Sequence, residues 1–296
     1  MKKMIFSGFA IFSLLILSSA PAMAYMLDGD ISDWGIDLSI DGDGKFNNSW
    51  VPSSTTAFYT QSNDVGPLSG KPSGGEAFDA EALYFDSDSN YAYFALVTSA
   101  NPHGMDLNYP YNYDYDFGSG DLAIKFGVGE NDFWKTSTAD FGIGIRPVGL
   151  PGGTEHRVSA SWGLVKKNVG DNLKWYHENG YSWSEFDQAY FDANTGTDVG
   201  LLGINDIIWK QWHESNDIGV GYWDSPQTKS GTWVLEARVP ISYFGSDWAD
   251  GREISIRWTP DCVNDYIEVN GVVPEPGSMI LLAIGLFCMA AIRKRQ

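Results

Sequence analysis

The chain has 296 residues, with 19 lysines and arginines against 38 aspartates and glutamates, and a formal net charge of −19. Five of the basic residues lie in the two terminal segments described below, which leaves 19 − 5 = 14 basic residues against 38 acidic ones, or −24 when Glu275 of the C-terminal segment is still counted. Such a surface repels phosphate backbones and anionic lipid, which argues against nucleic-acid and direct headgroup binding. A hydrophobic content of 43% can supply a core and argues against chain-wide disorder.

The first 24 residues have the pattern of a secretory signal peptide. Lys2-Lys3 form a positive region, Met4 to Leu17 form an apolar region, and Ala22-Met23-Ala24 supplies small residues at Ala22 and Ala24 for cleavage before Tyr25. Residues 1–24 are therefore predicted to direct export and to take no part in the fold.

The body, residues 25–273, is predicted to be one domain rich in strands. Aromatic and β-branched residues fill Leu83 to Phe85 and Tyr91 to Thr98, and turn-forming residues from Asp86 to Asn90 separate them, which predicts a hairpin. Further strands are predicted between Gly, Asn, Asp and Pro turns at Asp121 to Val128, Phe141 to Val148, His156 to Val165, Ile218 to Trp223, Trp233 to Val239, Glu253 to Trp258 and Tyr266 to Val269.

Helical periodicity is weak and predicts two short helices, Ile204 to Trp212 and Ser242 to Trp248. Many short strands between turns indicate an all-β fold, a two-sheet antiparallel β-sandwich of jelly-roll type. The body has one cysteine, Cys262, so no disulfide within it is predicted, and its stability depends on the core or on metal.

Carboxylates at close spacing suggest two metal sites. Asp41, Asp43 and Asn47 place oxygen ligands around glycines, as a calcium turn does, although Trp50 stands where an EF-hand would have its bidentate Glu. Asp79 and Glu81 would point to the same face of a strand. A calcium site, a glycosidase-like acid pair and a solvated turn all fit this second pair. Asp86, Asp88 and Asn90 form a weaker calcium candidate, and the four histidines show no zinc spacing.

Twelve tryptophans and many tyrosines could stack on sugar rings. Core packing is the competing explanation, and it is preferred for Trp233 and Trp258 in strong strands. The candidate glycan contacts lie in aromatic segments rich in Asn, Asp and Gln, and they are Tyr111, Tyr113, Tyr115, Trp175, Trp183, Trp209 and Trp212.

The C-terminal segment, residues 274–296, has three parts in order. Pro274-Glu275-Pro276 comes first, the uncharged apolar run Met279 to Ile292 follows, and Arg293-Lys294-Arg295 closes it. Basic residues after an apolar run hold that end in the cytoplasm, so the body should lie on the other side of the membrane. The predicted transmembrane segment, 279–292, would cover about 21 Å of a hydrocarbon core of about 30 Å, which suits a temporary hold.

This order of features resembles the PEP-CTERM sorting tail, and an ordinary C-terminal anchor is the alternative. The resemblance implies recognition by an exosortase in a Gram-negative, exopolysaccharide-producing bacterium, after export by the Sec machinery. It also marks Pro274, Glu275, Pro276 and the residues Arg293, Lys294 and Arg295 as sorting signals.

Two stretches of the body, Leu27 to Trp34 and Trp233 to Ile241, resemble the opening and a late strand of family 9 carbohydrate-binding modules. Gly74 to Phe85, Gly120 to Ile124 and Trp258 to Val269 resemble a group of exosortase-dependent surface proteins, with Val263 in place of a glycine. The first resemblance implies a sandwich that holds its ligand against aromatic rings.

These patterns together predict an exported protein that passes through an inner-membrane intermediate to the cell surface or extracellular matrix, where it binds or organises polysaccharide. A structural surface protein without sugar recognition is the alternative. A carbohydrate-active enzyme that uses Glu76, Asp79 or Glu81 is the third hypothesis. Because spacing in the sequence cannot show whether two carboxylates face each other across a sugar, no catalytic residue is predicted. No cofactor is expected beyond a possible calcium ion, and nucleic acid is not an expected partner.

Overall fold

The computed structural model describes residues 25–38, 51–52, 57–60, 80–100, 102, 105–106, 116–117, 119–127, 139–145, 162–170, 172–173, 175–176, 190–191, 194–214, 231–249, 251–260 and 266–273. Within these residues the fold is all-β, with two main antiparallel sheets, three short 3-10 helices and no α-helix. The predicted signal peptide and the C-terminal segment lie outside the described residues.

The first sheet has five strands in the order β1-β2-β3-β13-β12. Their bounds are β1 Ala57–Thr60, β2 Ala80–Ser87, β3 Tyr91–Thr98, β13 Gly231–Pro240 and β12 Ile207–Glu214. Strands β2 and β3 form a hairpin in which Phe85 is opposite Phe94, and β3 then pairs along its whole length with β13. Strand β13 ends at Pro240, as expected of a residue that cannot donate to the ladder.

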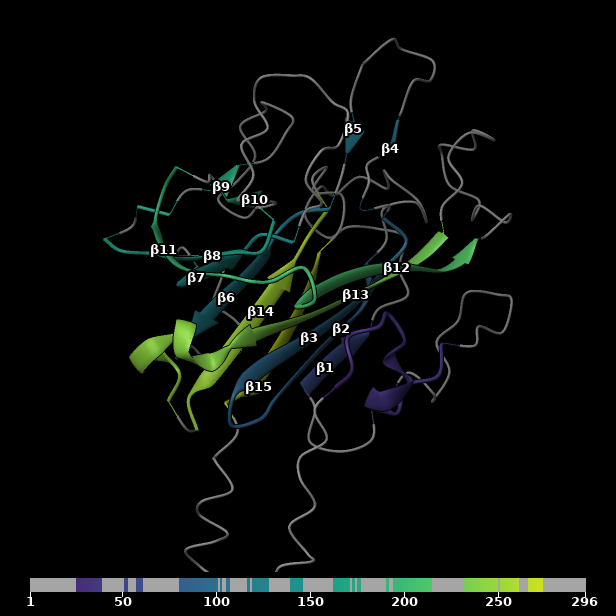
Figure 1. Cartoon of the computed structure of the whole chain (residues 1–296), viewed down its shortest axis with the longest axis horizontal. Coiled ribbons are helices and arrows are strands. Elements are labelled where there is room, and N and C mark those ends of the chain that lie inside the picture. The colour runs from purple at the N-terminus through teal and green to yellow at the C-terminus, as the bar shows by residue number, and fades with distance from the viewer. Residues whose placement is uncertain are drawn as a thin grey trace, which may run out of the picture.

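The second sheet has six strands in the order β11-β8-β7-β6-β14-β15 (Figure 1). Their bounds are β11 Thr197–Leu201, β8 Leu164–Lys167, β7 Phe141–Ile143, β6 Leu122–Phe126, β14 Glu253–Trp258 and β15 Ile267–Val272. Two small pairs complete the strands, β4 Met105–Asp106 with β5 Asp116–Phe117, and β9 Trp175–Tyr176 with β10 Tyr190–Phe191. The 3-10 helices are η1 Ile31–Trp34, η4 Ile241–Tyr243 and η5 Gly245–Asp247.

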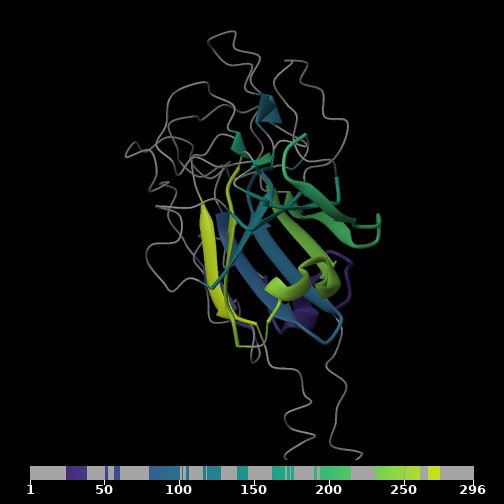
Figure 2. The ribbon, with the colours of Figure 1, turned by 90° about the vertical axis from the view of Figure 1, so that its left-hand side faces the viewer.

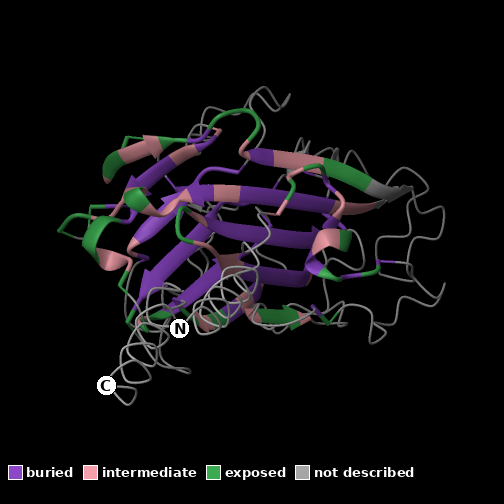
Figure 3. Ribbon diagram, turned by 60° about the horizontal axis from the view of Figure 1, so that its bottom comes forward, coloured by how far each residue is buried: buried purple, intermediate pink, exposed green. Residues whose placement is uncertain are grey.

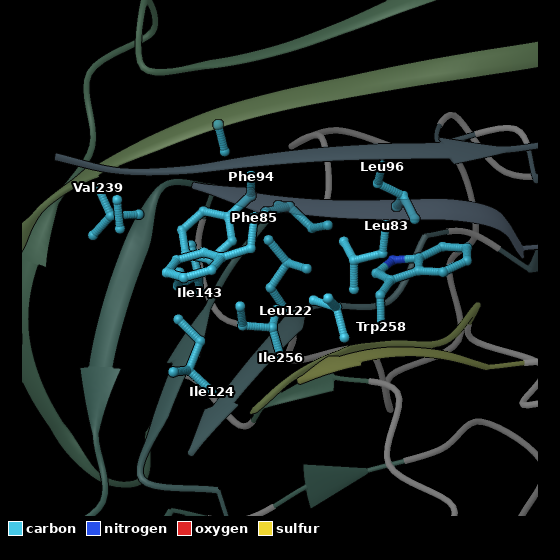
Figure 4. Packing of buried hydrophobic residues seen from close by; sticks show 14 of the residues in the cluster. Leu83, Phe85, Phe94, Leu96, Leu122, Ile124, Ile143, Val239, Ile256 and Trp258 are labelled. Carbon is cyan, nitrogen blue, oxygen red and sulfur yellow. The ribbon is translucent and has the colours of Figure 1, made fainter. Parts of the chain in front are cut away.

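The main core lies between the two sheets. Because successive side chains of a strand point to opposite faces, Leu83, Phe85, Phe94 and Leu96 all project from the inner face of the five-stranded sheet. They meet residues of the second sheet, among them Leu122, Ile124, Ile256 and Trp258 (Figure 4). The described strands therefore pack face to face as a β-sandwich.

The outer face of the five-stranded sheet is also buried, under the N-terminal segment, residues 25–38. Ile31, Trp34, Ile36 and Leu38 of this segment pack on a second cluster formed by Ala82, Tyr84, Tyr93, Ala95, Val97 and Val234. Strands β2 and β3 are thus covered on both faces (Figure 3). This double burial explains why β3 is apolar along almost its whole length instead of alternating.

The structure confirms several predicted strands. The hairpin is present with a longer first strand, Glu253 to Trp258 matches β14, β13 includes its predicted residues, and β15 starts at Ile267, one residue later than predicted. The first predicted strand of the second sheet ends earlier than expected, at Phe126, because Gly127 adopts a positive φ of 81°. Strand β7 covers the start of Phe141 to Val148, and β8 overlaps only the end of His156 to Val165. The predicted strand from Ile218 to Trp223 lies outside the described residues.

One of the two predicted short helices was wrong, and the other is present only as two 3-10 helices. Most of Ile204 to Trp212 forms strand β12, because this stretch pairs with β13 from Ile207 opposite Ala237 to Glu214 opposite Gly231. Ser242 to Trp248 falls in the two short 3-10 helices η4 and η5 and not in an α-helix. The jelly-roll comparison and the domain limits 1–24, 25–273 and 274–296 stay predictions.

Candidate functional site

The sandwich has two ends, and the C-terminal segment leaves from one of them, called here the tail end. At this end Val273, which is fully buried, follows β15, and its N–H donates to the carbonyl of Arg252 at 2.8 Å. Gly271 of β15 lies close to β2, since a Cβ on it would be 3.6 Å from Cδ1 of Phe85. The tail end therefore groups the turn 88–90, Gly127, the stretch 241–249 and residues 251–252 (Figure 1).

The predicted first residue of the exported chain lies at the same end. The ring of Tyr25 stacks on Trp34 with 4.0 Å between centroids, and its hydroxyl donates to the carboxylate of Asp86, just before the turn 88–90. The predicted cleavage position and the start of the C-terminal segment thus share one end of the sandwich. This arrangement fits a body held to a membrane first by its leader and then by its tail.

Glu236 holds the N-terminal segment on the outer face. Its side chain is fully buried, and its carboxylate accepts hydrogen bonds from the backbone N–H of Asp28 at 3.0 Å, from that of Gly29 at 2.6 Å and from the Trp34 indole at 3.3 Å. Burial raises the pKa of Glu236 to about 7, even though the N–H groups of Gly29 and Asp28 act to lower it. The segment before Trp34 is therefore held to β13 through its backbone N–H groups and the indole of Trp34.

Sequence reasoning missed Glu236. The alternation of β13 places Leu235 and Ala237 in the main core and so places Glu236 on the opposite face. An alternating strand normally turns such a residue toward water. The only signal that it is buried was the neighbouring Val234, which shares its face and belongs to the outer cluster.

The opposite end of the sandwich, called the far end, contains the two small strand pairs (Figure 2). Asp121 joins one pair to the second sheet, since its carboxylate accepts from the N–H of Phe191 at 3.0 Å and from that of Ile145 at 3.3 Å. The indole of Trp258 donates to Ser119 Oγ at 3.2 Å and to the Gly120 carbonyl at 3.1 Å. These bonds close the core at the far end.

Most of the candidate glycan contacts belong to segments that start and finish at the far end. Tyr111, Tyr113 and Tyr115 lie between β4 and β5, Trp183 lies between β9 and β10, and all four are outside the described residues. Trp175 is in β9 and Trp212 is in β12, where the structure describes the backbone alone. The strands that flank these aromatic segments therefore lie at the end away from the tail.

Trp209, Trp233 and Trp258 differ in how far their side chains are buried. Trp209 is half-buried against the main core, and its indole donates to the carbonyl of Ile145 at 2.9 Å. That contact favours a packing role for Trp209. Trp258 is fully buried, as predicted, whereas Trp233 is only half-buried.

The metal candidates are placed only in part. Asp41, Asp43, Asn47 and Asp79 lie outside the described residues. Glu81 is half-buried in β2, and its Oε1 accepts from Ser99 Oγ at 3.2 Å. Among the residues that the structure describes, no group of three or more His, Cys, Asp or Glu could hold a metal ion.

The third metal candidate forms the predicted turn instead. Asp88 accepts from the N–H groups of Asn90 at 2.6 Å and Tyr91 at 2.8 Å, and from the Tyr93 hydroxyl at 2.8 Å. Asp86 accepts from the N–H of Ser87 at 2.7 Å as well as from Tyr25. These carboxylates hold the hairpin turn and the N-terminal segment together.

Ion pairs neutralise another carboxylate at the tail end. Asp247 of η5 accepts from Lys167 Nζ at 2.5 Å and from Arg252 Nη1 at 3.2 Å. Burial alone would raise the pKa of Asp247, but the two cations outweigh it and hold this pKa below its ordinary value.

Comparison with known proteins identifies the C-terminal segment. Residues 272–296 match the family described as the PEP-CTERM protein-sorting motif. No curated protein matches the chain. The predicted resemblance to family 9 carbohydrate-binding modules therefore has no support.

The motif supports an exported protein that an exosortase-dependent system sorts to the cell surface through a membrane-anchored intermediate. None of the helices in the described part of the chain is long and apolar enough to cross a membrane, and the apolar run 279–292 lies outside that part.

Proposed function

We propose that this sorted surface protein binds or organises extracellular polysaccharide through the aromatic segments of its far end. The single observation that supports the proposal is the opposition of the two ends. The tail leaves beside the turn 88–90, whereas the segments that hold Tyr111, Tyr113, Tyr115 and Trp183 begin and finish at the far end. A body anchored by its tail would present those segments away from the membrane.

The chemistry of these segments suits a neutral or cationic glycan. Flat aromatic rings stack on the C–H faces of sugars, and the neighbouring Asn, Asp and Gln side chains can bind hydroxyl groups. The strongly acidic body makes an anionic polymer a poor partner. We propose the extracellular matrix of a Gram-negative bacterium as its location and a binding role, not an enzymatic one.

Affinity electrophoresis in gels that contain matrix polysaccharide tests the proposal. The exported protein should be retarded, and Tyr113→Ala and Trp183→Ala should each weaken the retardation severalfold, because each removes a flat ring that can stack on the C–H face of a sugar. Tyr59→Ala is the matched control, since Tyr59 is 51% exposed on the edge strand β1 and belongs to none of these aromatic segments. Absence of retardation with every matrix glycan would favour a purely structural surface protein.

Calcium binding is a separate proposal that rests on the oxygen-rich spacing of Asp41, Asp43 and Asn47. A metal that binds only the folded protein raises the melting temperature. Excess calcium should therefore raise the melting temperature and chelator should lower it again, and an identical melting temperature under both conditions would remove the proposal.

A further inference from the structure

The sorting motif begins inside the folded body. Its first matched residue, Val272, is the last residue of β15, and the next, Val273, is fully buried. Two backbone hydrogen bonds fix Val273, one from its N–H to Arg252 at 2.8 Å and one to its carbonyl from the N–H of Gly251 at 3.0 Å. No spacer therefore separates the sandwich from Pro274.

The distance from the body to the membrane is correspondingly short. Residues 274–278 are all that lies between Val273 and the apolar run that starts at Met279. Five residues span at most about 17 Å, and the headgroup layer takes up about 5–7 Å of that. In the membrane-anchored intermediate the tail end would then stand at most about 10 Å above the headgroups. An enzyme that acts near Pro274-Glu275-Pro276 must work beside this end.

In the part of the chain that the structure describes, the tail end carries few exposed charges. Most of the described residues that are exposed there are small, namely Ser89, Asn90, Gly127, Ser242, Gly245, Ser246, Ala249 and Gly251, and Val272 at the end of β15 is 53% exposed. The carboxylate of Asp88 is hydrogen-bonded within the turn, and that of Asp247 forms ion pairs with Lys167 and Arg252. The side chain of Glu253 is exposed at the edge of this end. In a chain with a net charge of −19, this is a surface that another protein can approach closely.

We propose that the tail end is a docking surface for the sorting enzyme, which would hold the folded body and the motif at the same time. The proposal rests on exosortase-dependent sorting and is independent of polysaccharide binding. A protein surface fits better than the bilayer itself, because an acidic body and anionic headgroups repel each other. The fixed position of Val273 would let docking place the Pro274-Glu275-Pro276 segment for the enzyme.

The test follows the conversion of the full chain from its membrane-anchored form to its processed form in the producing cells, with time, by mass. Ser246→Glu and Ser246→Lys place a charge of either sign on the tail end, and each should slow conversion at least threefold. Gln211→Glu and Gln211→Lys are the matched controls. Gln211 is exposed and lies opposite Trp233, which itself pairs with Thr98 at the far end. These controls should convert at the wild-type rate.

A second variant separates docking from simple crowding. Ten Gly and Ser residues inserted between Val273 and Pro274 leave the motif and the body intact but uncouple their positions. Docking predicts slower conversion of this variant, whereas a tail end that only obstructs the enzyme predicts faster conversion.

Three results would overturn the proposal. One is equal conversion of the Ser246 and Gln211 variants when their urea midpoints match that of the wild type. Another is slowing by Glu together with acceleration by Lys at position 246, which would assign the surface to the bilayer. The third is conversion of the spacer variant at or above the wild-type rate. None of these depends on glycan retardation, so this proposal and the proposed function can fail separately.

Discussion

The two faces of the five-stranded sheet are both apolar and both buried, but they are covered in different ways. The inner face packs against a second sheet through apolar side chains such as Phe94, which is fully buried. The outer face is covered by a single segment, residues 25–38, which is held by the buried carboxylate of Glu236. The inner face is therefore stabilised by close packing of apolar side chains. The cover of the outer face is stabilised in addition by the hydrogen bonds that the carboxylate of Glu236 accepts from the N-terminal segment.

The largest effect should come from a cavity on the inner face. Phe94→Ala removes a fully buried ring that packs against Phe85 with 5.7 Å between centroids, so the free energy of unfolding should fall by about 3–5 kcal/mol. Urea denaturation measures the loss. Tyr59→Ala on the same sheet is the control, because Tyr59 is 51% exposed and its removal should cost less than about 1 kcal/mol. Similar losses for both would contradict a core between the sheets.

The next largest effect is a pH dependence that comes mainly from a buried carboxylate on the outer face. The pKa of Glu236 is raised to about 7 in the folded protein against a value of 4.5 without the fold, so the folded state binds the proton more tightly. The stability contribution is therefore fully present below pH 4.5 and is lost as the pH rises through 7, by up to about 3 kcal/mol. Burial also raises the pKa of the nearby Asp33, which adds to the same trend.

Urea midpoints measured from pH 4.5 to 8 would show this dependence as a steady decrease. Glu236→Gln does not titrate and should flatten the curve, whereas Glu253→Gln, at an exposed position of β14, should leave it unchanged. Stability that rises with pH over this interval would show that the carboxylate is stabilised, not destabilised, by its surroundings.

At a single pH, Glu236→Gln should loosen the N-terminal segment without opening the core. An amide keeps one acceptor oxygen but turns an NH2 group toward either the N–H of Gly29 or the indole of Trp34, which should cost about 1–3 kcal/mol. Hydrogen exchange should accelerate in residues 25–38 and stay slow in β6 and β14. Equal acceleration in these strands would mean that the two faces unfold together.

The smallest expected losses of stability come from two glycine substitutions, and comparing them separates backbone strain from side-chain packing. Gly29→Ala combines a φ of 75° with a Cβ only 2.4 Å from Cβ of Lys210. Gly170→Ala has a φ of 63° and nothing within 4 Å, so it measures the backbone cost alone, about 1–2 kcal/mol. Gly29→Ala should lose more stability than Gly170→Ala in urea denaturation, and equal losses would mean that the contact with Lys210 gives way freely.

The same contrast explains what the sequence could predict. The β2–β3 hairpin and β14 are readable because their alternation and turn residues are local. Strand β12 was mistaken for a helix because the spacing of Ile208, Trp209 and Trp212 also fits a helical face, and only pairing with β13 decides between them. The burial of Glu236 depends on a segment about 200 residues earlier in the chain, which no local pattern reports.

The candidate sites also differ in whether they can be predicted from local sequence or only from contacts between distant segments. The sorting motif is a continuous signal, so residues 272–296 could be recognised from order and composition alone. A role for Trp209 could not be read in this way, because its contact with Ile145 comes from another sheet. The far-end position of β4, β5, β9 and β10, the strands that flank the aromatic segments, likewise comes from the topology and not from a local pattern.

The most direct test of the proposed function is hydrogen exchange of the exported protein with and without matrix polysaccharide. Binding at the far end predicts slower exchange in peptides that cover residues 107–115 and 177–189, with no change in the turn 88–90 or in residues 241–249 at the tail end. Unchanged exchange throughout the chain at saturating polysaccharide, or protection confined to the tail end, would contradict polysaccharide binding by the far end.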